Sequence, residues 1–280
     1  MLWFIFALGA GLSKSILDLL SKKFMLKTHQ HVVTFSRFLY SLPFLFIAAY
    51  FFGTGETDIY FWLAVIAGVP LEIGAIYMYM KAIRLSPLSV VIPMLGLSPI
   101  FILVTSYLML NEAPSILGLF GILVVSLGIY MVGLNNKGLL EPFKALGRDL
   151  GVRLMLATAV LYSFTPVIIK IGAQHSDVYT FLSLYVAAIT LVYAFFLKAK
   201  DIKEFKNPFL VSLGLFFAAE AILGLVALKL AFVNYAMAVK RTSIIFSGVF
   251  GFMFFKEKDI FKRLTGAVLI TAGIFVIYLA

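Results

Sequence analysis

Cysteine is absent from the 280-residue sequence, and histidine occurs only three times, at His29, His31 and His175. Without cysteine the chain can form neither disulfide bridges nor thiolate metal ligands, and the three histidines lack a metal-binding spacing. The HExxH, Gly-x-Ser-x-Gly and Walker A motifs are missing as well. We therefore predict no catalytic residues, no metal site and no cofactor, and the sequence favours neither an enzyme nor an ATP-driven pump.

Charged residues are also scarce. They make up 13% of the chain, whereas hydrophobic residues make up 62% and the mean hydropathy is +1.06. A soluble domain has roughly 45–50% apolar and about 25% charged residues. The composition therefore predicts an integral membrane protein surrounded by a lipid bilayer. Despite a net charge of +10, we expect no nucleic-acid partner, because the basic residues lie in short loops between apolar segments.

Long apolar runs predict an all-α protein with ten transmembrane helices, since a helix needs about 20 apolar residues to cross a bilayer. The segment 1–10 lacks the basic start and cleavage site of a signal peptide, so we include it in the first helix. The expected helices cover residues 2–21, 32–52, 60–83, 87–109, 114–134, 150–172, 178–197, 208–232, 234–255 and 261–279.

Lysine and arginine are concentrated in alternate loops. Of the 23 basic residues, 17 lie in loops that follow odd-numbered helices, and the loops after even-numbered helices contain almost none. The positive-inside rule places loops rich in these residues in the cytoplasm. We therefore expect a multi-pass protein of the cell membrane with both termini extracellular.

The second half of the chain repeats the first. Residues 111–132 match residues 256–277 at an offset of 145, which aligns Glu112, Gly121 and Gly128 with Glu257, Gly266 and Gly273. The glycines recur every seven residues and predict close helix packing. Because each half has an odd number of helices, the halves have opposite orientations, as in many secondary transporters. We expect two inverted five-helix repeats, 1–134 and 150–280, joined by loop 135–149.

These motifs resemble the EamA family of the drug/metabolite transporter superfamily. The resemblance rests on the duplicated Glu-x8-Gly-x6-Gly pattern, on Arg37 early in the second helix and on FFKEK before the tenth. It implies export or exchange of small metabolites and structural roles for Arg37, Glu112 and Glu257, the two glutamates near the starts of the fifth and tenth helices. It also implies cytoplasmic termini, which differs from the charge distribution.

Two carboxylates lie near the middle of predicted helices. Glu72 and Glu220 each come 12 residues after the start of the third and eighth helix, which is about 18 Å into the membrane. Because ionisable groups are costly at this depth, they are candidate site residues that bind a substrate amine or exchange a proton. The alternative is that both are hydrogen-bonded packing residues.

Three further residues are weaker candidates for substrate binding. Lys14 and Asp18 are four residues apart, so they share one helix face and can form an ion pair that either lines the site or only joins helices. Lys170 lies near the end of the sixth helix, where its side chain could instead extend to the membrane interface.

Lys240 and Arg241 are adjacent in the ninth helix. Neighbouring residues on a helix point about 100° apart, so at least one side chain should face the protein interior. VKRTSIIFS is similar to the Lys-Arg pair that holds phosphate in related branches of the superfamily, which implies binding of a carboxylate or phosphate. The alternative is that both side chains extend to lipid headgroups.

These features predict a secondary active transporter, not an enzyme, for a small polar or zwitterionic metabolite such as an amino acid. It would work by alternating access around a site near the membrane midplane. An organic-phosphate or nucleotide-sugar-like exchanger is the alternative, and a membrane enzyme or a structural membrane protein is the alternative of another class. We expect a functional monomer, and the sequence leaves open whether a proton or a counter-substrate is coupled.

Overall fold

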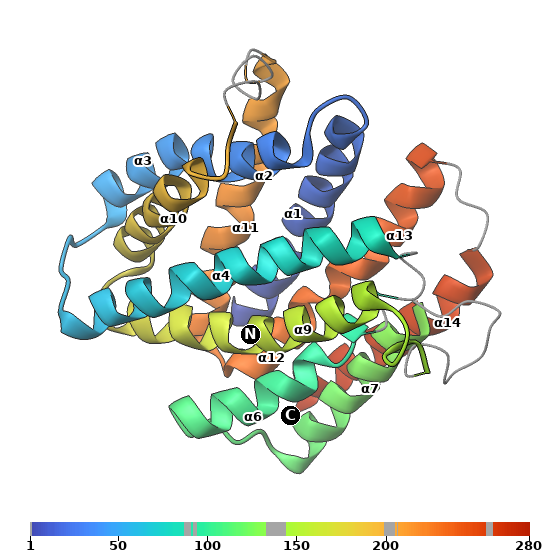
Figure 1. Cartoon of the computed structure of the whole chain (residues 1–280). Coiled ribbons are helices and arrows are strands. Elements are labelled where there is room, and N and C mark those ends of the chain that lie inside the picture. Colours follow the sequence, from blue (N-terminus) through green and yellow to red (C-terminus); the bar gives the residue numbers. More distant parts are fainter. Residues whose placement is uncertain are drawn as a thin grey trace.

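The computed structural model describes residues 2–86, 91, 94–132, 144–198, 205, 207–255 and 260–280, and regular structure in these ranges is helical (Figure 1). The predicted all-α fold is confirmed. Glu257 and most of the loop 135–149 lie outside the described residues. The unbroken helices are α1 (Leu2–Met25), α4 (Ile59–Leu85), α6 (Ser98–Leu110), α7 (Ile116–Val132), α9 (Leu150–Gln174), α10 (Val178–Ala194), α11 (Val211–Leu230) and α14 (Ile260–Leu279).

The helices have the length and apolar surface of a multi-pass membrane protein. In the described part of the chain, five helical segments are long and apolar enough to cross a bilayer, and shorter apolar helices accompany them. Large apolar side chains point outward, including Tyr50 at 84% exposure and Ile116 at 90%. Such a surface is suited to lipid rather than to water.

Three spans that the sequence predicts as continuous are interrupted, so the predictions 32–52, 87–109 and 234–255 are wrong in this detail. The fourth span has a turn at Gly96 and Leu97 before α6 begins. The second span divides into α2 (Gln30–Leu39) and α3 (Leu42–Phe52), where Pro43 lacks the N–H that would continue α2. The ninth span divides into α12 (Val233–Lys240) and α13 (Thr242–Phe255), with Arg241 between them. The eighth span begins with the short turn η2 (Pro208–Leu210).

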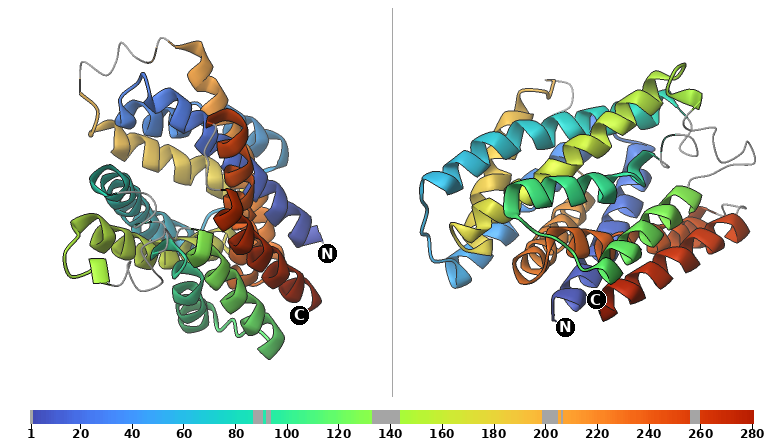
Figure 2. Two further views of the ribbon diagram at one scale, coloured as in Figure 1. Left: turned by 90° about the vertical axis from the view of Figure 1, so that its right-hand side faces the viewer. Right: turned by 90° about the horizontal axis from the view of Figure 1, so that it is seen from below.

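The pair α7 and α14 shows the inverted repeat directly (Figure 2). A Cβ atom on Gly121 would collide with the backbone of Gly273, and one on Gly128 would collide with the backbone of Gly266. The later glycine of α7, Gly128, faces the earlier glycine of α14, Gly266, so the two helices are antiparallel. Gly121 and Gly266 are equivalent in the repeat, as are Gly128 and Gly273, so exchanging the halves converts one contact into the other. The predicted close packing is confirmed.

Other helix contacts are also converted into one another when the two halves are exchanged. The first span packs on the eighth, α1 on α11, and its equivalent is the contact of the sixth span with the third, α9 on α4. The contact between α6 and α9 likewise has its counterpart in the contacts of α1 with α12 and α13. A two-fold axis between antiparallel equivalent helices lies in the membrane plane.

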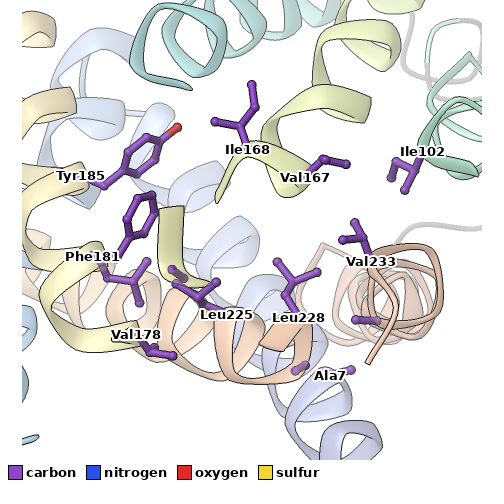
Figure 3. Packing of buried hydrophobic residues seen from close by; sticks show 14 of the residues in the cluster. Ala7, Ile102, Val167, Ile168, Val178, Phe181, Tyr185, Leu225, Leu228 and Val233 are labelled. Carbon is purple, nitrogen blue, oxygen red and sulfur yellow. The ribbon is translucent and has the colours of Figure 1, made fainter. Parts of the chain in front are cut away.

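The connections at 53–58, 110–115, 175–177 and 231–232 lie at the same end of the bundle as both termini (Figures 1 and 2). We call this the termini end, and the opposite end, which includes the described lysine- and arginine-rich connections, the basic end. Figure 3 shows apolar side chains in contact in the half nearer the termini end, among them Ala7, Phe181, Leu228 and Val233. Smaller apolar clusters lie towards the basic end, one around Leu17 and Val33 and one around Met94 and Met155, so apolar packing extends along the bundle.

Candidate functional site

Glu220 and Lys240 form an ion pair between α11 and α12. Glu220 lies near the middle of α11 and is 8% exposed, whereas Lys240 is the last residue of α12. Gly224, one turn after Glu220, lies beside the Lys240 ammonium group and leaves space for that side chain. Two residues that the sequence assigns to one site are thus in contact, and each compensates the charge of the other.

Glu72 joins this pair from the opposite side. It lies near the middle of α4 and interacts electrostatically with Glu220, Lys240 and Lys14, and also with the hydroxyl of Thr165. The helices α4 and α11 are equivalent in the two halves, so carboxylates on equivalent helices face the same polar region. The structure therefore brings together Glu72 and Glu220, as the sequence predicts.

Lys14 and Asp18 extend the cluster towards the basic end. Lys14 Nζ lies 2.7 Å from Asp18 Oδ1, and Arg37 Nη2 of α2 lies 3.6 Å from the same oxygen. Arg37 Nε also donates a hydrogen bond to Ser21 Oγ at 3.0 Å. The side chains of Lys14 and Asp18 remain 35% and 40% exposed, so solvent-sized molecules can reach them.

Two tyrosines complete the polar region. Tyr79 of α4 interacts electrostatically with Asp18 and Arg241, and Tyr162 of α9 interacts with Glu72 and Asp18. The charges of α1 therefore act across the space between α1 and the pair of α4 and α9. Hydroxyl groups in such a position can donate hydrogen bonds to a bound anion or accept them from a bound amine.

Arg241 lies at the break between α12 and α13 and points inward. Its Nη2 donates a hydrogen bond to Ser98 Oγ at 2.7 Å, and its Nε is buried without a hydrogen-bond partner. Among the described residues Arg241 forms no ion pair. A partly buried guanidinium group whose hydrogen-bond partner, within the described part of the chain, is a neutral hydroxyl retains the capacity to bind an anion.

Lys170 lies elsewhere, at the termini end. Its Nζ donates to Glu112 Oε1 at 2.5 Å and to the carbonyl oxygen of Ala231 at 2.6 Å, and Glu112 Oε2 accepts a hydrogen bond from the Val233 N–H at 2.6 Å. The lysine is 5% exposed, so it does not extend to the interface. Glu112 also does not cap its own helix, since α7 begins at Ile116. It caps α12 instead.

A second polar contact joins loops at the termini end. Asp177 Oδ1 accepts hydrogen bonds from the backbone N–H groups of Tyr179 and Thr180, which caps α10, and Oδ2 accepts from the N–H and the hydroxyl of Thr54. Burial of this carboxylate opposes its ionisation, but hydrogen bonds from Thr180, Thr54 and Tyr179 outweigh burial and lower its pKa to about 2. The contact ties the connection 53–58 to α10.

Of the predicted site residues, the structure brings together Glu72, Glu220, Lys240, Arg241, Lys14 and Asp18 and separates Lys170 from them. Sequence reasoning assigned Arg37 and Glu112 only structural roles near helix ends. Arg37 instead contributes a charge to the cluster, and the only signal for this was its depth of several residues in an apolar span. Ser98 gave no signal, because a serine next to a proline is common at any helix start.

The sequence profile of the EamA-like transporter family matches residues 1–134 and again residues 149–279. This chain belongs to the EamA-like transporter family. The double match is that expected from the two repeats seen in α7 and α14, and it makes the protein a membrane transporter by family.

Other comparisons bear on the fold alone. A solved crystal structure, described only as that of a protein, superposes on this EamA-like transporter with a TM-score of 0.77 at 15% identity. The superposition covers 99% of this chain and 96% of the other. At that identity the likeness shows a shared fold and nothing about the substrate. Curated proteins include no match to the sequence.

Proposed function

We propose that this EamA-like transporter is a secondary active transporter for a small zwitterionic metabolite such as an amino acid. The observation that carries the proposal is the Glu220–Lys240 ion pair, which lies beside Glu72 and close to Arg241. A zwitterion has the same two charges as this ion pair. It can therefore replace the internal contact with two contacts to the substrate, one at each end.

In this account the substrate amine binds between Glu220 and Glu72. Because the amine binds Glu220, Lys240 is released from its ion pair. The substrate carboxylate then binds Lys240 and Arg241, whose Nε has no hydrogen-bond partner. Charge-assisted contacts of this kind are about twice as strong as neutral hydrogen bonds, so they can offset the desolvation of the substrate. The exposure of Lys14 and Asp18 supports entry from the basic end, and buried apolar side chains lie between the site and the termini end.

The charges of the site favour this substrate class over an organic phosphate. The cluster has four cations, Lys14, Arg37, Lys240 and Arg241, and the three carboxylates Asp18, Glu72 and Glu220 compensate most of their charge. A phosphate with two negative charges requires a larger excess of cations. In an organic-phosphate exchanger, these three carboxylates would have no role in binding the substrate.

We further propose that the halves 1–134 and 150–280 move against each other around this site in a functional monomer of the cell membrane, with the basic end in the cytoplasm. The distribution of lysine and arginine supports this orientation. Labelling of a cysteine in place of Lys144 by an impermeant reagent in intact cells tests it. Strong labelling would reverse the orientation and place the termini in the cytoplasm.

Transport itself is tested by counterflow in liposomes. A thermal-shift screen of metabolite pools first selects ligands of the purified protein, and counterflow then measures their exchange. We expect an amino acid or a similar zwitterion to exchange, and Glu72→Gln and Glu220→Gln to reduce the rate in folded protein. Wild-type rates in both variants across the accessible pH range would show that these carboxylates are packing residues.

A further inference from the structure

Three parts of the chain meet at the buried pair of Glu112 and Lys170. Glu112 lies in the connection before α7, Lys170 lies in α9, and both bind the connection between α11 and α12, at Ala231 and Val233. The two side chains are 9% and 6% exposed. Every polar atom of the carboxylate is engaged, so this pair fixes the α11–α12 connection to α9 and to the loop before α7.

The helix α12 links this pair to the candidate site. Its first residue, Val233, donates its N–H to Glu112, and its last residue, Lys240, forms the ion pair with Glu220. Eight residues of helix are about 12 Å long, so α12 spans the distance between the two contacts. The two ends of α12 are therefore held by two different ion pairs.

Apolar side chains fill the space between the site and the buried pair. Figure 3 shows Ala7, Val167, Leu228 and Val233 within one packed cluster, and Ala7 is 1% exposed. This cluster lies between the site and the termini end. Val233 belongs both to the cluster and to the hydrogen bond with Glu112, so a shift of α12 would disturb this packing.

We propose that the Glu112–Lys170 pair is a latch that holds the termini end closed, and that α12 couples this latch to the occupancy of the Glu220–Lys240 pair. Substrate that separates Glu220 from Lys240 frees one end of α12 and weakens the hold of Glu112 on the other. A buried ion pair can act as a contact that is either closed or open, because its charges are stable when paired and costly when left unpaired in the interior. The coupling rests on the proposed transport, whereas closure by the latch does not.

The absence of cysteine permits a direct test, since a single introduced cysteine is the only labelling site. Ala7→Cys places a small thiol in the apolar cluster, and the protein is labelled in nanodiscs with a water-soluble maleimide without substrate. The latch is removed by Glu112→Gln together with Lys170→Met, which leaves no unpaired buried charge and so favours folding. Lys229→Met is the matched control, because Lys229 is an exposed lysine at the same end.

We expect the latch variant to be labelled about ten times faster or more, as follows from loss of a charge-assisted hydrogen bond in the closed state. Lys229→Met should be labelled at the original rate. Glu220→Gln should also accelerate labelling, and in the latch variant it should add nothing further. Unchanged labelling in the latch variant would refute the latch, and unchanged labelling in Glu220→Gln would refute its coupling through α12. Failure to exchange any zwitterion, with labelling as expected, would instead refute the proposed substrate class.

Discussion

Arg241 Nη2 lies 2.7 Å from Ser98 Oγ, and this contact joins two breaks that are equivalent in the inverted repeat. Gly96 lies at the turn before α6 and precedes Arg241, at the turn before α13, by 145 residues. The backbone is thus interrupted at the same place in both halves, but only the second half has a charge there. The two halves share a fold and differ in their chemistry.

Arg241 is expected to contribute directly to substrate affinity. Arg241→Ala should weaken the binding of a zwitterion by about 10- to 150-fold, the loss of one charge-assisted contact of about 1.5–3 kcal/mol. Arg241→Lys should not restore it, because an ammonium group cannot make the paired hydrogen bonds of a guanidinium group to a carboxylate. Affinities for a zwitterion and its neutral analogue measure the effect. Equal losses for both ligands would mean that Arg241 has only a structural role.

The Glu220–Lys240 pair should show different effects of single and double substitution. Lys240→Met leaves the buried Glu220 carboxylate unpaired and should lower the free energy of unfolding by up to about 3–5 kcal/mol. Adding Glu220→Gln should recover most of that loss while transport stays impaired. Thermal unfolding in detergent measures both variants. Lys14→Met is a control, since its pair with Asp18 is more exposed and is expected to contribute only about 0–1 kcal/mol.

The glycines between α7 and α14 should not accept larger side chains. Gly128→Val places methyl groups against the backbone of Gly266, so the helices must separate, at a cost of about 1–3 kcal/mol. Leu127→Val changes the neighbouring residue, which is 52% exposed, and should leave stability nearly unchanged. Thermal unfolding compares the two. A neutral Gly128→Val would contradict the close antiparallel contact.

Stability should depend on the ionisation of Asp177 in a defined pH range. Its pKa of about 2 is below the ordinary value of about 3.9, so its contacts stabilise the fold above pH 4 and are lost as the pH falls towards 2. Asp177→Ala should lower stability by about 0.5–2 kcal/mol near pH 7, as for loss of a helix cap. The difference between variant and wild type should shrink below pH 4. A difference that stays constant from pH 7 to pH 3 would be evidence against this role.

The fold could be predicted from the sequence because its signals are repeated. Long apolar runs identify spans by length alone, and Gly121, Gly128, Gly266 and Gly273 identify both the repeat and its helix contact. The break at Arg241 could not be predicted in the same way. No proline or glycine lies beside Arg241, and the interruption depends on packing against α1, where Gly11 allows close approach to Lys240 and Thr242.

The residues of the candidate site could be predicted from the sequence, but the ion pairs between them could not. Depth in the membrane identified Glu72 and Glu220, but an offset of 145 residues places Phe217 rather than Glu220 opposite Glu72. Nothing in the spacing indicates that Glu220 pairs with Lys240 or that Lys170 pairs with Glu112, because both contacts join residues distant in sequence. Such pairs depend on how far each helix is displaced along its neighbour, which only the packed structure defines.

The most direct test of the central claim is counterflow in liposomes with three matched substrates that share one side chain. These are the zwitterionic amino acid, its methyl ester, which retains only the amine charge, and its N-acetyl derivative, which retains only the carboxylate. If the substrate occupies both Glu220 and the Lys240–Arg241 pair, the zwitterion should exchange at least about tenfold faster than either derivative. Equal or faster exchange of the N-acetyl derivative would contradict the account and favour an organic-anion exchanger.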